Sequence, residues 1–276
     1  MSGTLYLVAT PIGNLGDFSP RAVETLQNAD FIAAEDTRVT MKLLNYFGIK
    51  KPLISYFEHN RVYSGEKILQ RLINGENVAL VSDAGMPAIS DPGEDLVRLC
   101  GEANVKVCCV PGPCALVSAL AVSGLSTQRF TFEGFLSTSN KSRAQHLESL
   151  KNEQRTMVIY EAPHKLMLTL SDLRETFGGE RKISLCREIT KLYEETLRTT
   201  IDGAIAHFSE TPPKGEFVLV IAGAPEDDMP KLSLPQALEL VAAYREEGKS
   251  LKDAAKLAAA DSGYSKNELY AAALGN

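Results

Sequence analysis

Apolar and polar residues alternate in blocks through residues 1–124. Short, continuous apolar runs are each followed by a longer segment of helical periodicity. Continuous runs are typical of strands buried on both faces, as in a parallel sheet covered by helices. We therefore predict an α/β domain with a mostly parallel sheet at 1–124. Its predicted strands are 4–9, 31–34, 52–57, 78–81 and 105–110, and its predicted helices are 20–28, 37–47, 64–75, 92–103 and 113–122.

Capping residues indicate where several of these helices begin and end. Ser19 and Pro20 supply an N-cap and a first-turn proline for the first helix, and Gly48 is placed to end the second. Ser64 is predicted to cap the third helix.

A second block at 125–225 repeats the alternation with different loops. Strands are predicted at 130–135, 157–160, 183–187 and 217–221, and helices at 141–150, 165–177 and 202–208. The polar stretch 191–198 is interpreted as a mobile or antiparallel segment. This block is therefore predicted to be a second α/β domain with a mixed sheet.

The C-terminal part, 231–276, has only helical periodicity. Residues 225–230 have the composition of a linker, and Gly248 and Gly263 separate helices predicted at 234–247, 251–260 and 266–274. Three short helices of this kind are typical of a small helix-turn-helix-like module.

Charge and cysteine content exclude several classes of protein. The formal net charge of -6 argues against binding nucleic acid through bulk positive charge, although residues 141–225, with 12 basic and 12 acidic side chains, are neutral. The five cysteines contain no C-x-x-C pair, so no disulfide framework or zinc site is indicated. No signal peptide or apolar run of membrane-spanning length is present. We expect a cytosolic protein with no membrane association.

Three loops at predicted strand ends are rich in Gly, Pro and small polar residues. They are residues 9–17, 82–93 and 111–115, and the carboxyl ends of parallel strands are where such sheets bind ligands. Each loop alone could equally be a tight turn, but three at one sheet edge favour a binding site. The dinucleotide fingerprint, the P-loop and the G-x-S-x-G elbow are all absent, and no histidine pair has metal-like spacing. No metal is expected.

Charged residues also follow two of the predicted strands. Glu35, Asp36 and Arg38 come directly after the strand at 31–34, where they either contact a substrate or form a helix cap with a surface ion pair. Glu161 follows the strand at 157–160, where a purely structural helix N-cap is the alternative to a functional role.

The motifs in these loops resemble one known family in sequence and in order. They are ATPIGNLGD at 9–17, AAEDTR at 33–38, SDAGMPAISDPG at 82–93, PGPCAL at 111–116, YEAPHK at 160–165 and GEFVLVIAG at 215–223. The chain resembles the bacterial 16S ribosomal RNA methyltransferase I family, which methylates a ribose 2'-hydroxyl and belongs to the tetrapyrrole methylase-like class of S-adenosylmethionine enzymes. The resemblance covers nearly the whole chain, with Cys114 where the family pattern has Ser.

The resemblance implies a function and a set of cofactor contacts. It implies a homodimer of two-domain subunits, S-adenosylmethionine in the cleft between the domains, and methylation of a cytidine in the decoding region of 16S RNA within the 30S small subunit. By motif, the residues expected to contact the cofactor are Pro11, Asp83, Ala84, Gly85, Met86, Cys114, Ala115, Tyr160, Glu161 and Val218.

A ribose hydroxyl is a poor nucleophile, so a general base is expected to help the reaction. The candidate bases are Glu161, Glu35, Asp36 and Asp17, and Glu35, Asp36 and Arg38 are also interpreted as orienting RNA. The other candidate RNA contacts are Arg61, Lys165 and Arg187.

Most remaining basic residues are expected to be solvated surface charges. In the second block these are Lys141, Arg143, Lys191 and Arg198. Lys249, Lys252 and Lys256 are predicted to share one helix face, as a ribosome-facing stripe or simply the wet side of an amphipathic helix, and Lys266 lies in the last helix.

Two alternatives remain open. A methylase of small tetrapyrroles would share the fold and the cofactor, and a ribosome assembly factor without turnover would share the cleft. An RNA enzyme that recognises a ribonucleoprotein by shape and splays out one nucleotide needs only local positive charge, so weak affinity for naked RNA is expected.

Overall fold

The computed structural model describes residues 2–225 and 232–274, and the chain forms two compact units. The first unit contains the residues up to Glu148 together with Arg155–Ala222. The second unit contains Ser149–Gln154 and the residues from Gly223 onward. Both α/β sheets lie in the first unit, so the predicted boundary at 124/125 separates two sheets rather than two compact units. That boundary and the one at 225 stay predictions.

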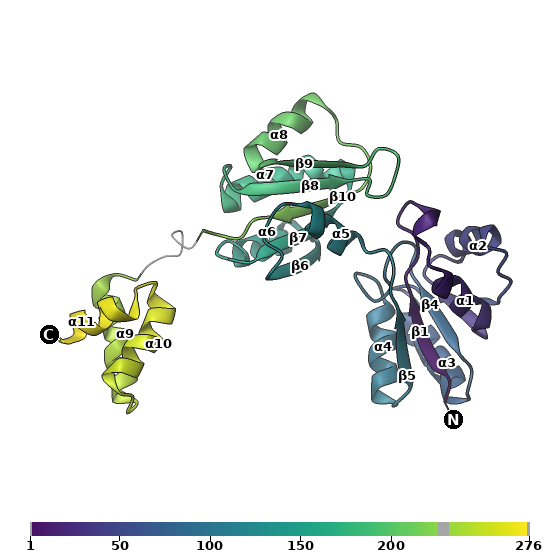
Figure 1. Cartoon of the computed structure of the whole chain (residues 1–276), viewed down its shortest axis with the longest axis horizontal. Helices are drawn as coiled ribbons and strands as arrows, with labels where there is room; N and C mark the ends of the chain where they lie inside the picture. The colour runs from purple at the N-terminus through teal and green to yellow at the C-terminus, as the bar shows by residue number, and fades with distance from the viewer. Residues whose placement is uncertain (1, 226–231, 275–276) are drawn as a thin grey trace. The chain divides into compact units, whose positions relative to one another are not determined.

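The first sheet is fully parallel, as predicted from the continuous apolar runs. Its strand order is β3-β2-β4-β1-β5, and β4, β1 and β5 are seen side by side in Figure 1. Strands β2 and β4 are completely buried. The strands are β1 Thr4–Val8, β2 Phe31–Ala34, β3 Leu53–Ser55, β4 Val78–Val81 and β5 Lys106–Val110.

Helices cover both faces of this sheet. Neighbouring residues of a strand point to opposite faces, so they pack on different helices. Ile32 packs with Leu26 and Leu44 from α1 and α2, whereas Ala33 packs with Ile68 from α3 and Leu96 from α4. These helices are α1 Pro20–Asn28, α2 Thr37–Tyr46, α3 Arg61–Ile73 and α4 Gly93–Glu102, with a 3₁₀ turn η1 at Leu15–Asp17, and α5 Ala115–Val122 follows β5 in the chain.

The predicted caps of α1 and α2 are confirmed, and that of α3 is wrong. Ser19 accepts a hydrogen bond from the Ala22 amide, and Gly48 follows α2 with a φ of +67°. Ser64 is buried inside α3, which begins at Arg61. The helix starts earlier because Asn60 closes the preceding turn, accepting from the Phe57 amide and donating to the Ser55 carbonyl.

The second sheet is mixed, as predicted. Its order is β6-β7-β10-β8-β9, with β6 parallel to β7 and the other pairs antiparallel. The stretch 191–198, interpreted as mobile or antiparallel, leads into the antiparallel edge strand β9. The strands are β6 Phe130–Phe135, β7 Thr156–Glu161, β8 Lys182–Arg187, β9 Glu195–Thr200 and β10 Phe217–Ile221.

One helix links the two sheets. Although α5 directly follows the first sheet in sequence, Leu116, Ala119 and Leu120 of α5 pack on Val158 and Val220 of the second. The other helices of this part are α6 Asn140–Ser149, α7 Leu166–Phe177 and α8 Ile201–Glu210, with a 3₁₀ turn η2 at Pro163–Lys165. Because α5 packs on the second sheet, the chain that leaves the carboxyl end of β5 is held against that sheet.

The three predicted C-terminal helices are present. They are α9 Leu234–Glu246, α10 Leu251–Ser262 and α11 Lys266–Leu274, and they enclose a core that includes Ala237, Val241, Ala254 and Leu269. The lysine stripe is wrong in one position, because Lys249 precedes Ser250, the N-cap of α10. Only Lys252 and Lys256 are four residues apart within α10. The predicted linker at 226–230 lies outside the described residues.

Among residues 2–225 and 232–274, no helix is both long and apolar enough to cross a lipid bilayer.

Candidate functional site

A large cavity lies at the carboxyl ends of the parallel strands, where the sequence places the Gly- and Pro-rich loops. Its volume is about 600 Å³, and residues from both sheets line it. All but one of the ten cofactor contacts expected from the motifs are in its wall: Asp83, Ala84, Gly85, Met86, Cys114, Ala115, Tyr160, Glu161 and Val218. The exception is Pro11, which lines a neighbouring smaller cavity, while Ile12 lines the large one.

The loop after β4 is fixed against the loop after β1 by main-chain hydrogen bonds. The Thr10 amide donates to the Gly85 carbonyl at 2.9 Å, and the Gly85 amide donates back at 3.1 Å. Gly85 has a φ of +89°, a conformation that L side chains rarely adopt. The hydroxyl of Ser82 also donates to the Gly85 carbonyl, at 3.2 Å. This part of the cavity wall is therefore main chain held in one conformation.

The rest of that loop stores backbone strain next to the cavity. Ala88 and Ser90 have φ values of +67° and +63°, which are unfavourable for residues with a side chain. Asp91 holds them in place, since its Oδ1 accepts from the amides of Ala88 at 3.0 Å and Gly93 at 2.7 Å. Its Oδ2 is buried and has no partner within the described part of the chain, although Asp91 lines the cavity. A buried oxygen of this kind is a ready acceptor for a ligand donor.

The opposite wall comes from the second sheet, where β7 and β10 pair. Tyr160 lies opposite Val218, and its hydroxyl accepts the Leu116 amide at 3.1 Å, joining the start of α5 to the sheet. The Tyr160 ring also makes edge contacts with Phe132 and Phe135. Burial raises the pKa of Tyr160 to about 12, so its hydroxyl stays protonated at neutral pH.

Glu161 lies in the cavity wall, but its carboxylate is already engaged. It is 4% exposed, accepts the Ala162 amide at 2.8 Å, and accepts the hydroxyl of Thr169. That hydroxyl in turn accepts from Arg143 at 2.7 Å, and Arg143 pairs with Asp172. These contacts hold Glu161 in place.

The expectation that Arg143 is a solvated surface charge is wrong. Arg143 is 5% exposed, because α6 turns it toward Thr169 and Asp172 of α7. A buried guanidinium needs carboxylate and hydroxyl acceptors, and α7 provides both.

The three charged residues after β2 separate in space. Glu35 lines the cavity, and its pKa is raised chiefly by burial and further by the charges of Asp83 and Asp91. Asp36 instead caps α2 by accepting from the Arg38 amide, and its pKa is lowered to about 2 by hydrogen bonds from Arg38. The Arg38 side chain is 87% exposed. Asp36 and Arg38 thus form a helix cap and a surface ion pair, and their contact with RNA stays a prediction.

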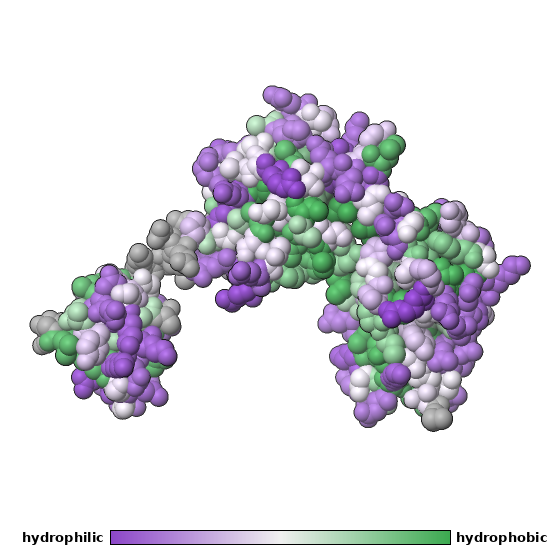
Figure 2. Space-filling model, viewed as in Figure 1, coloured by the Kyte–Doolittle hydropathy of each residue, from purple (hydrophilic) through white to green (hydrophobic). Residues whose placement is uncertain are grey.

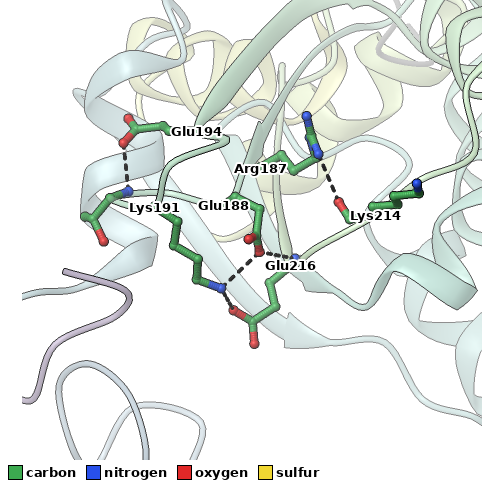
Figure 3. A network of polar contacts seen from close by, with 7 residues as sticks. Arg187, Glu188, Lys191, Glu194, Lys214 and Glu216 are labelled. Atoms are coloured by element: carbon green, nitrogen blue, oxygen red, sulfur yellow. Dashed lines mark hydrogen bonds and ion pairs between the residues drawn. The ribbon is translucent and has the colours of Figure 1, made fainter.

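A lysine also lines the cavity, and sequence reasoning did not select it for the site. Lys191 lies in the loop between β8 and β9, and its Nζ contacts Glu188 at 2.9 Å and Glu216 at 2.8 Å (Figure 3). All three residues line the cavity. Glu188 and Thr190 have φ values of +51° and +69°, so the loop bends sharply to bring Lys191 back to the sheet.

This loop also touches the first loop of the parallel sheet. A Cβ atom on Gly13 would lie 2.4 Å from Cγ of Lys191 and 2.9 Å from Oγ1 of Thr190. Glycine at this position therefore allows the two loops to meet beside the cavity.

Gly13→Ala is accordingly expected to push the Lys191 loop away and weaken ligand binding in the large cavity, by about tenfold if one ordered contact is lost. Removing Cγ of residue 191 in a Gly13→Ala, Lys191→Ala double variant relieves most of the overlap, so affinity is expected to recover relative to Gly13→Ala. Gly101→Ala in α4 is the control, since a Cβ there meets nothing within 4 Å. Calorimetric titration with S-adenosylmethionine measures each affinity, and equal affinities for Gly13→Ala and Gly101→Ala would contradict the role of this contact.

The other basic candidates lie outside the large cavity, and Arg61 and Arg187 are paired with carboxylates. Arg61 contacts Asp95 at 2.8 Å and Glu58 at 3.3 Å, and Arg187 contacts Glu195 at 2.8 Å. Lys165 ends η2. The acid Asp17, at the end of η1, does not line the cavity either.

Sequence reasoning missed two kinds of lining residue: some lie inside the quoted motifs but were not singled out, and others come from positions without a motif. Asp91, within 82–93, and Glu216, within 215–223, are of the first kind, whereas Glu188 carried no signal apart from following a strand. The missed residues are Ile12, Ser82, Ile89, Ser90, Asp91, Phe135, Ala162, Pro163, His164, Glu188, Ile189, Lys191 and Glu216. In the described part of the chain, no group of three His, Cys, Asp or Glu side chains is arranged to hold a metal ion.

Solved structures share the fold at low sequence identity. A diphthine synthase aligns with a TM-score of 0.60 and 14% identity over 80% of this chain and 90% of its own. The methyltransferase CobJ aligns with a TM-score of 0.59 and 18% identity over 81% and 95%. These similarities concern the fold alone.

Sequence relatives are much closer and span the whole chain. The family of Tetrapyrrole (Corrin/Porphyrin) Methylases matches residues 4–205, and the RsmI C-terminal HTH domain matches residues 233–276. A protein of Synechocystis sp. named ribosomal RNA small subunit methyltransferase I is 52% identical over 97% of this chain and 96% of its own. One of Halalkalibacterium halodurans with the same name is 47% identical over 97% and 93%. The chain therefore belongs to the tetrapyrrole methylase family, and within it to the ribosomal RNA small subunit methyltransferase I family.

Proposed function

We propose that this chain transfers a methyl group from S-adenosylmethionine to the ribose 2'-hydroxyl of a cytidine in the decoding region of 16S RNA, within the small ribosomal subunit. The observation that carries the proposal is the large cavity at the strand ends, lined by nine residues of the family motifs. Relatives that are 52% and 47% identical and are named for action on small-subunit RNA support the substrate class.

The residues of the cavity suit S-adenosylmethionine. This cofactor carries no phosphate, so it needs amides, carbonyls and apolar surface rather than a basic clamp. The cavity offers the main chain around Gly85, the apolar side chains of Met86 and Val218, and the free oxygen of Asp91 as an acceptor. Lys191, the only lysine among the described residues of its wall, forms ion pairs with two glutamates. When bound, the cofactor supplies a methyl group on a positively charged sulfur.

Glu35 is the best placed of the candidate general bases. The carboxylate of Asp36 is held by Arg38, and that of Glu161 is held by Ala162 and Thr169. Glu35 lines the cavity and, within the described residues, accepts a hydrogen bond from the Asp83 main chain only, and its raised pKa makes it a better proton acceptor than an ordinary carboxylate. We assign it to accept the proton of the ribose hydroxyl as that oxygen attacks the methyl group.

We also propose a homodimer, and the surface of the second sheet supports it. Hydrophobic residues gather over β6, β7 and α5 (Figure 2). The exposed apolar side chains of α5 and the edge strand β6 are Val117, Val122, Phe130 and Phe135. An exposed apolar patch beside an edge strand is a common interface between subunits.

Labelled S-adenosylmethionine incubated with purified small subunits tests the function. We expect label in 16S RNA, in a nucleotide whose ribose resists alkaline cleavage on its 3' side because the 2'-oxygen is methylated. Free 16S RNA is expected to be a poor substrate, since the net charge of -6 gives weak affinity for naked RNA. Label on a base, or in a tetrapyrrole precursor offered in a parallel reaction, would overturn the proposal.

A further inference from the structure

A second cavity lies beside the first and has no role in the function described so far. Its volume is about 330 Å³, and it is formed by the loop after β1, one face of α2 and the start of the loop after β4. Ser82 and Asp83 line both cavities, so the two share a wall. A molecule whose two halves are joined by a short linkage can therefore occupy both sides of that wall.

The lining of the second cavity is apolar and partly aromatic. Val39, Leu43 and Tyr46 follow one another at helical spacing along α2, and Leu15 of η1 contributes from the neighbouring loop. Tyr46 is 68% exposed, and its ring is held by an edge contact with Phe47, with 4.9 Å between the ring centroids. An exposed ring next to aliphatic side chains suits a flat aromatic ligand that stacks.

One charged residue and the size of the cavity indicate what that flat ligand is. Lys42 lines the cavity and adds a positive charge to its wall, as a ligand attached to phosphate requires. The volume is at the low end of the range of about 300–1,000 Å³ for ligand pockets, which suits a single nucleobase better than a tetrapyrrole.

Thr40 supplies the most specific observation. It lines the cavity and is 2% exposed, yet its hydroxyl has no hydrogen-bond partner within the described part of the chain. Other helical threonines satisfy their hydroxyls locally: Thr25 donates to the Arg21 carbonyl at 2.7 Å and Thr176 to the Asp172 carbonyl at 2.9 Å. A buried hydroxyl without a partner destabilises the fold unless a ligand pairs with it.

We propose that the second cavity receives the nucleobase of the nucleotide to be methylated, splayed out of the RNA, with its ring on Tyr46 and its polar edge on Thr40. The ribose then lies over the wall of Ser82 and Asp83, between the base in one cavity and the cofactor in the other. Glu35, whose pKa responds to the Asp83 charge, lines the cofactor side of that wall. The inference rests on the proposed function and adds to it the place of the substrate base.

Two variants and one matched control test this placement, with the full-length protein, small subunits and labelled S-adenosylmethionine. Tyr46→Ala removes the stacking surface and is expected to lower kcat/KM for small subunits about ten- to a hundredfold. Thr40→Val removes only the unpaired hydroxyl and is expected to lower it about fivefold. Tyr63→Ala is the control, since Tyr63 is 65% exposed on α3 and lines neither cavity.

Binding and stability separate a substrate contact from a structural role. We expect all three variants to bind S-adenosylmethionine within about twofold of the unchanged protein, because the large cavity is left intact. Thr40→Val is expected to melt at the same temperature or higher, since it removes an unsatisfied buried group. A structural threonine would give the opposite change in melting temperature.

The outcomes distinguish failure of this inference from failure of the proposed function. If the unchanged protein methylates small subunits and Tyr46→Ala and Thr40→Val match Tyr63→Ala, the base does not use this cavity and the proposed function stands. A loss of cofactor affinity in Tyr46→Ala would also overturn the inference, because the second cavity would then belong to the cofactor site. If the unchanged protein transfers no methyl group to small subunits, the proposed function fails first.

Discussion

Replacing Arg143 with methionine is expected to lower the free energy of unfolding by about 3–5 kcal/mol. Arg143 is the cation that faces Asp172 directly and Glu161 through the hydroxyl of Thr169. Methionine fills similar volume, so little packing is lost, but a carboxylate that is 4% exposed then remains without a nearby positive charge. The melting temperature should fall by roughly 10 °C for a protein of this size.

The matched control is another arginine–aspartate pair nearby. Arg174 of α7 contacts Asp202 at 2.6 Å, but its side chain is 60% exposed. Because exposed ion pairs contribute little, Arg174→Met is expected to change the unfolding free energy by less than about 1 kcal/mol. Thermal and urea unfolding followed by circular dichroism measure both. Equal melting temperatures for the two variants would mean that burial of the Arg143 network does not stabilise the fold.

The network also explains why sequence alone misjudged Arg143. The acceptors that make its burial possible, Thr169 and Asp172, lie 26 and 29 residues further along the chain. Periodicity describes each helix separately and does not show which faces meet. The sheets were easier to predict, because a continuous apolar run such as that of β4 indicates that both faces of the strand are covered.

The same distinction applies to the site. The loops after β1, β4 and β5 were predictable because parallel strands deliver their carboxyl ends to one edge, and the structure places them around one cavity. Glu188, Lys191 and Glu216 were not, since their joint position depends on two positive-φ residues and on the pairing of β8 with β10. For Glu35, Asp36 and Arg38, the sequence left a helix cap and a functional role as alternatives. The fold divides them, with Asp36 at the cap and Glu35 in the cavity wall.

Because Glu35 lies in the cavity wall as the proposed base, Glu35→Gln is expected to lower kcat by about a hundred- to ten-thousandfold. The affinity for S-adenosylmethionine is expected to change little. The amide keeps the size of the side chain but cannot accept the proton of the ribose hydroxyl. The rate of the unchanged protein should rise with pH through the raised pKa of Glu35, and the residual rate of the variant should lack that rise. Glu66→Gln in α3 is the control, since Glu66 is exposed and lines neither cavity.

Stability should move in the opposite direction to activity. Because the folded-state pKa of Glu35 is raised above its unfolded value, its contribution to stability is present below the unfolded pKa of about 4.3 and is lost as pH rises through the folded pKa. Near pH 8 Glu35 is ionised beside Asp83 and Asp91, so removing its charge is expected to raise the urea midpoint. At pH 4 the difference should shrink. If Glu35→Gln lost activity without gaining stability at pH 8, Glu35 would not be a buried carboxylate crowded by other negative charges. The reason for assigning it as the base would then fail.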